Sequence, residues 1–171
     1  TEGVAGPKQP SGATPVFEEE LDSWSAPFVM ASINTKNVHR SNFLLAHEYG
    51  EDFVYDEMMF TGPGEVGEAT AKAVAADKSM AQSPLKPGEG PSKEEREAGF
   101  YDVLFIGSND KGDVIKVGVK GDKDPGYGST SKMIVESAVC LLKNPDAASG
   151  GIWTPGGAIA SLLIDRLQSN A

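Results

Sequence analysis

The sequence predicts an α+β fold in which a mixed or antiparallel sheet carries helices mainly on one face. Residues 100–107 and 113–121 are rich in Val, Ile, Phe and Tyr and flank a turn-rich segment, which is typical of a β-hairpin. Along 113–121, apolar residues alternate with a second set that includes lysines and a glycine. One face of this strand should therefore be apolar and the other exposed to solvent. Several segments with helical periodicity accompany these strands.

The first half of the chain is expected to contain a lead-in, a helix and a strand. Residues 1–20 hold three prolines and no periodic pattern, which predicts a flexible lead-in to one domain over 21–171. Asn34 or Thr35 can cap a helix that runs to about residue 46. Phe, Val and Tyr in 53–61 predict a strand.

The second half begins with an Ala-rich helix over 65–81 and an exposed, Pro-rich loop near 82–99. Ser129 or Thr130 is expected to cap a helix whose stretch Met133–Leu142 is almost wholly apolar and should therefore be buried. A last amphipathic helix follows Pro155.

Composition excludes several partners. Fifteen Lys and Arg against 25 Asp and Glu give a net charge of −10, which repels nucleic acid and anionic lipid. No apolar run approaches the ~20 residues of a membrane helix. Cys140 is the single cysteine and there are two histidines, so neither an internal disulfide nor a common zinc site can form, and we expect no bound metal. With no signal-peptide pattern, a cytoplasmic location is expected.

Gly62, Gly64 and Gly67 match the G-x-G-x-x-G pattern of a dinucleotide-binding loop. We interpret the match as a glycine-rich turn that leads into a helix and not as a cofactor-binding loop. The preceding strand carries acidic residues where a buried parallel strand should be apolar, and Glu65 would repel a pyrophosphate. A Pro/Gly-rich loop follows the helix where the motif needs a second strand.

Two polar groups of residues are candidates for ligand binding. His39 and Arg40 share the polar face of the first helix, where Arg40 can bind a carboxylate or phosphate and His39 can donate a proton. A solvated helix face is the simpler interpretation. Gly126 and Tyr127 precede a helix whose free amides can bind an anion; the alternative is a Pro-Gly turn with a packing tyrosine.

Three blocks of the sequence resemble a known family. The run APFVMASINTKNVHRSN at 26–42, GDKDPGYGST at 121–130 and GGIWTPGG at 150–157 are similar, in this order, to motifs of saccharopine dehydrogenase-like NAD(P)-dependent oxidoreductases, including the trans-acting enoyl reductase group. The polar residues at the matching positions are expected to bind a small-molecule substrate. Together with the two polar groups described in the preceding paragraph, they make up the candidate substrate-binding residues Asn34, Thr35, His39, Arg40, Asn42, Gly126, Tyr127 and Thr130. The resemblance assigns no catalytic residue.

The resemblance further implies that NAD or NADP is bound by an upstream nucleotide-binding (Rossmann) domain that is not in these 171 residues. The chain is then the C-terminal, substrate-side and dimerisation domain, which binds no cofactor and is inactive by itself. The apolar stretch Met133–Leu142 needs covering, and a homodimer is one way to provide this. The alternative function is a stand-alone, non-enzymatic module for dimerisation or small-ligand binding.

Overall fold

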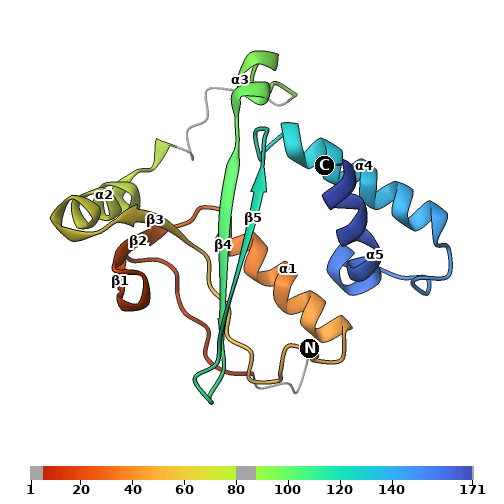
Figure 1. Cartoon of the computed structure of the whole chain (residues 1–171), viewed down its shortest axis with the longest axis horizontal. Helices are drawn as coiled ribbons and strands as arrows, with labels where there is room; N and C mark the ends of the chain where they lie inside the picture. Colours follow the sequence, from red (N-terminus) through yellow and green to blue (C-terminus); the bar gives the residue numbers. More distant parts are fainter. Residues whose placement is uncertain (1–5, 80–87, 171) are drawn as a thin grey trace. The chain divides into compact units, whose positions relative to one another are not determined.

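A computed structural model of the chain describes residues 6–79 and 88–170 and has the predicted α+β fold (Figure 1). By its internal contacts the chain forms two compact units. Unit 1 takes residues 1–84 and 151–157, and unit 2 takes 85–150 and 158–171. None of the described helices is both long and apolar enough to cross a membrane.

Unit 1 is built on a three-stranded antiparallel sheet in the order β1-β2-β3. Its elements are β1 Val16–Glu18, the 3-10 helix Glu19–Leu21, β2 Ser23–Pro27, α1 Ala31–Leu44, β3 Met58–Gly62 and α2 Gly64–Ala76. Helix α2 packs against β2 and β3. Strand β1 and the 3-10 helix lie in the segment that we expected to be a flexible lead-in.

The glycine-rich segment at the junction of β3 and α2 allows the start of the helix to lie close to the end of the strand. A Cβ at Gly67 would lie 1.9 Å from the carbonyl oxygen of Gly62, so no larger residue fits there. Every strand pair in the described residues is antiparallel, and this turn therefore follows an antiparallel strand. It lacks the parallel β-α-β context of a dinucleotide loop.

Two predicted boundaries in unit 1 are wrong. Strand β3 begins at Met58 rather than near residue 53, because the backbones of Phe53 and Tyr55 bind the side chain of Gln9 instead of a neighbouring strand. Helix α1 begins at Ala31, and neither Asn34 nor Thr35 caps it. The Thr35 hydroxyl donates to the Ala31 carbonyl, as is usual for a threonine inside a helix.

Unit 2 contains a two-stranded ribbon and the last two long helices. Its elements are α3 Lys93–Ala98, β4 Tyr101–Ser108, β5 Val114–Gly121, α4 Gly128–Lys143 and most of α5 Pro155–Asn170. The predicted hairpin is present, with Tyr101 opposite Gly121 and Ser108 opposite Val114. Of the loop expected near 82–99, residues 82–87 lie outside the described residues, and the remainder includes α3.

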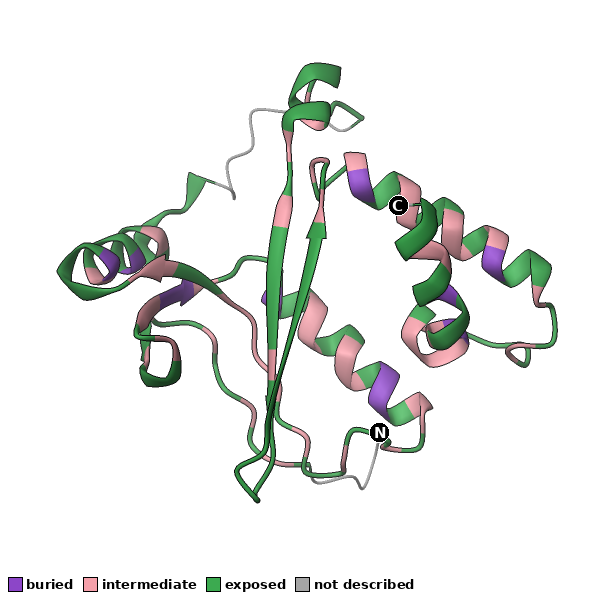
Figure 2. Cartoon of the chain, viewed as in Figure 1, coloured by how far each residue is buried: buried purple, intermediate pink, exposed green. Residues whose placement is uncertain are grey.

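The core of unit 2 is small. Cys140 of α4 packs with Ile159 and Leu163 of α5, and Ile159 departs from helical geometry, which kinks α5 there. The prediction that Met133–Leu142 is buried is wrong: Leu142 is 81% exposed, and Ile134 and Val135 are 66% and 57% exposed. In Figure 2 most of the ribbon is coloured as exposed, whereas exposed, intermediate and buried residues alternate along α4. The stretch is apolar except for Glu136 and Ser137, and of its residues Cys140 alone is buried, against Ile159 and Leu163 of α5.

Candidate functional site

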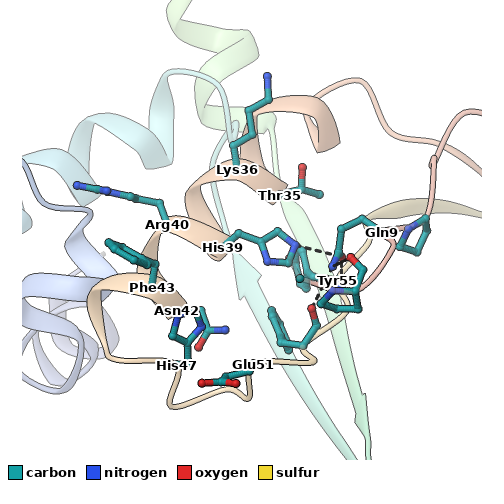
Figure 3. Close-up of a pocket in the computed structure, with 14 residues that line it drawn as sticks. Gln9, Thr35, Lys36, His39, Arg40, Asn42, Phe43, His47, Glu51 and Tyr55 are labelled. Carbon is teal, nitrogen blue, oxygen red and sulfur yellow. Dashed lines mark hydrogen bonds between the residues drawn. The ribbon is translucent and has the colours of Figure 1, made fainter. Parts of the chain in front are cut away.

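Unit 1 contains a pocket of about 580 Å³ between the N-terminal segment, helix α1 and the segment that leads to β3 (Figure 3). Four of the candidates predicted from the sequence line it together, and all four lie on α1: Thr35, His39, Arg40 and Asn42. The opposite side is formed by Gln9, Phe53 and Tyr55, which the sequence interpretation missed. Gln9 was missed because it lies between prolines in the segment expected to be a lead-in.

Gln9 connects the three walls of the pocket. Its amide nitrogen donates to the Phe53 carbonyl at 3.1 Å, and its amide oxygen accepts from the Tyr55 N–H at 3.1 Å. The same oxygen lies 3.1 Å from Nε2 of His39, whose ring points toward it in Figure 3. The edge-to-face contact of His39 with Phe53, with ring centroids 5.6 Å apart, restrains the imidazole further.

Behind this wall, Glu57 connects a predicted site residue to Tyr55. Its carboxylate accepts from the Asn34 amide at 2.9 Å and from the Tyr55 hydroxyl at 2.9 Å. Burial, followed by the hydrogen bond to Glu57, raises the pKa of the Tyr55 phenol far above its usual value. Tyr55 therefore stays protonated, and Asn34 supports the wall without lining the pocket.

Arg40 and Asn42 are partly occupied by contacts within unit 1. The Arg40 guanidinium lies over the Phe43 ring at 5.7 Å and donates to the Ile152 carbonyl at 3.3 Å, a contact that uses one of its five donors. The Asn42 side chain donates to the Gly50 carbonyl and accepts from the Tyr49 N–H, both at 2.9 Å. Asn42 thus holds the turn after α1 and presents little to a ligand.

The turn held by Asn42 is strained at the pocket. Ala46 and His47 have φ of 53° and 64°, a region that favours glycine. His47 and Glu51 line the pocket near this turn, and Lys36 and Arg40 extend from α1. The pocket therefore combines aromatic surface with two cations, one carboxylate and two imidazoles, which suits a small organic ligand with polar groups. No cluster of three or more metal-ligating side chains occurs among the described residues.

The remaining candidates, Gly126, Tyr127 and Thr130, lie at the N-terminus of α4 in unit 2. The Asp124 carboxylate already accepts from the backbone N–H groups of Gly126, Tyr127 and Gly128 at 2.6–3.2 Å. These amides are therefore not free, and the expected anion site is filled by the chain itself. Asp124, rather than Ser129 or Thr130, caps the helix; the Thr130 hydroxyl donates to the Pro125 carbonyl.

Comparisons with known proteins support a relationship to enoyl reductase-like proteins. A Mycobacterium tuberculosis protein named as a candidate trans-acting enoyl reductase is 33% identical, over 85% of this chain and 39% of its own length. Trans-acting enoyl reductases of Mycobacterium ulcerans and Mycobacterium bovis are 28% and 29% identical, over 84% of this chain and 39% of their length. The chain thus spans about two fifths of these relatives. No family model and no solved structure matches it.

Proposed function

We propose that this chain is the substrate-binding and dimerisation part of a saccharopine dehydrogenase-like, NAD(P)-dependent oxidoreductase of the cytoplasm that acts on enoyl substrates. The main support for this proposal is the pocket. It brings together Thr35, His39 and Arg40, from the block 26–42 that resembles this family, and places them opposite aromatic side chains. The similarity to proteins named trans-acting enoyl reductase supports the substrate class.

NAD or NADP, when bound by a nucleotide-binding domain outside these residues, would supply the hydride. The role that we propose for unit 1 is to bind the substrate. Its aromatic wall would contact the apolar chain of an enoyl group, and His39 and Arg40 would hydrogen-bond the polar end. Dimerisation is proposed for unit 2, where apolar side chains of the ribbon and of α4 are exposed.

The test is a pair of fluorescence titrations of the 171-residue chain. A trans-2-enoyl N-acetylcysteamine thioester should bind saturably, and NADPH should not. His39→Ala should weaken thioester binding roughly three- to tenfold, the size expected for one lost hydrogen bond. Lys72→Ala is the matched control, since Lys72 lies on α2, outside the pocket, and pairs with Glu68. Saturable NADPH binding, or equal thioester binding by both variants, would contradict the proposal.

The alternative, a non-enzymatic module for dimerisation or ligand binding, draws on the same pocket and on the exposed apolar ribbon. Expression of the chain together with its preceding coding sequence separates the two functions. Consumption of NADPH in the presence of the thioester supports the oxidoreductase. Thioester binding without NADPH consumption supports the module.

A further inference from the structure

The hydrogen bonds of Gln9 fix which way its side-chain amide faces. The amide nitrogen donates to two carbonyls, of Phe53 at 3.1 Å and of Pro7 at 3.3 Å, and the amide oxygen accepts from the Tyr55 N–H. A flipped amide would place its NH₂ group against that N–H and its oxygen against the carbonyls. All three bonds would be lost, so the oxygen must face Tyr55 and His39.

This orientation determines where His39 carries its proton. An amide oxygen can only accept, and it lies 3.1 Å from Nε2, so Nε2 must be the donor. In a neutral imidazole the other nitrogen, Nδ1, is then an unprotonated acceptor. No hydrogen-bond partner for Nδ1 is found in residues 6–79 and 88–170.

We propose that Gln9 is a positioning residue that holds neutral His39 as its Nε2–H tautomer and thereby makes Nδ1 the acceptor that the pocket offers its ligand. The ligand then presents a hydrogen-bond donor, an amide N–H or a hydroxyl, beside an apolar group that packs on the aromatic wall. Proton donation from His39 at this position requires the imidazolium, which adds its second proton at Nδ1. The inference rests on the proposed function only in treating the pocket as the substrate site.

The tautomer can be measured without any ligand by long-range ¹H–¹⁵N correlation on the ¹⁵N-histidine-labelled chain. His39 and His47 are the only histidines, and a His47→Gln variant assigns the two signals. At a pH where the ring is neutral, His39 should show a protonated Nε2 and an unprotonated Nδ1 with no admixture of the other form. A protonated Nδ1, or the solution mixture of tautomers, would overturn the role of Gln9.

A variant tests the cause. Gln9→Leu keeps the shape but removes the acceptor, so the His39 signals should move toward the mixture of tautomers while those of His47 stay in place. Gln168→Leu, on α5, is the matched control and should change neither histidine. Unchanged His39 signals in Gln9→Leu would contradict the proposal. The wild-type spectrum decides the tautomer even if this variant does not fold.

The ligand class is tested with two probes that differ in one N–H group. N-methylbenzamide should bind at least threefold more tightly than N,N-dimethylbenzamide and should shift the His39 Nδ1 signal. Equal affinities, or no binding of either probe, would overturn the ligand class. The thioester titration can fail while the tautomer and the benzamide preference hold, so failure of the proposed function is distinguishable from failure of this inference.

Discussion

At the scale of single residues, Asp124 controls the start of α4. Its carboxylate accepts from three successive backbone N–H groups, which offsets the lack of hydrogen-bond partners at a helix N-terminus. The bonds from Gly128 and then Tyr127 hold the pKa of this carboxyl below its usual value. A carboxyl whose pKa is lower in the folded state stabilises the fold above the unfolded-state pKa, near 3.8, and loses this effect as the pH falls.

Replacement of Asp124 should therefore destabilise the chain in a pH-dependent way. At pH 7 the urea midpoint of Asp124→Ala should lie below that of the wild type, and the difference should shrink as the pH falls through the unfolded-state pKa and below it. Circular dichroism measures it. Asp122→Ala is the control, because Asp122 is exposed and forms a 3.7 Å ion pair with Lys132. An equal effect of both variants would count against the capping role.

Tyr55 provides the opposite pH dependence. Its pKa is raised in the folded state, mainly by burial and by the hydrogen bond to Glu57. Its contribution to stability is present below the unfolded-state pKa of about 10 and is lost as the pH rises further. The urea midpoint of the wild type should therefore fall above pH 10 more steeply than that of Tyr55→Phe. Tyr127→Phe, at an exposed position, should keep the wild-type slope; equal slopes in all three proteins would contradict this account.

At the scale of elements, the sequence predicts structure that depends on neighbouring residues better than structure that depends on contacts between distant residues. The hairpin of β4 and β5 was predicted because alternation and turn residues lie within one short stretch. The start of β3 and of α1 was not, because each depends on a partner far away in sequence: Gln9 for the 53–55 segment and Glu57 for Asn34. The pocket itself joins residues about 40 positions apart, and no local signal at Gln9 indicates this.

The ribbon also has two unlike faces. Because side chains alternate along a strand, the register places six large apolar side chains on one face. They are Tyr101, Val103, Phe105, Ile115, Val117 and Val119. The other face is mixed: it carries Leu104, Ile106 and Val114 beside the 2.7 Å ion pair between Lys120 and Asp102. Ile115 is nevertheless 66% exposed. We propose that this apolar face is a surface for association.

If this face joins two copies, a charge on it should prevent dimerisation. Phe105→Lys should give a monomer in sedimentation equilibrium or light scattering, because the lysine would lose its hydration in the interface. Leu104→Lys is closely matched, since Phe105 and Leu104 are 44% and 42% exposed on opposite faces of β4. It should leave the dimer intact. A monomeric wild type, or equal behaviour of both variants, would contradict the assignment of this face.

At the scale of the whole molecule, each unit has a small core. Among the residues that the structure describes, the buried apolar ones of unit 1 are alanines, at positions 26, 31 and 71, and those of unit 2 are Cys140, Ile159 and Leu163. Alanine buries little apolar area, and burial stabilises by only about 25 cal/mol per Å². A chain with such cores and many exposed apolar side chains should gain much of its stability from whatever covers them.

A homodimer would therefore make thermal stability depend on concentration. Association binds the folded state only, so the Tm should rise by on the order of 2 °C for each tenfold increase in chain concentration, as for a dimer of this chain length. Scanning calorimetry over a hundredfold range measures the slope. Phe105→Lys should unfold at a lower Tm with no slope, and Leu104→Lys should keep the slope. A flat wild-type profile would show that a second copy does not cover the apolar face, and association with another part of a longer protein would then account for it.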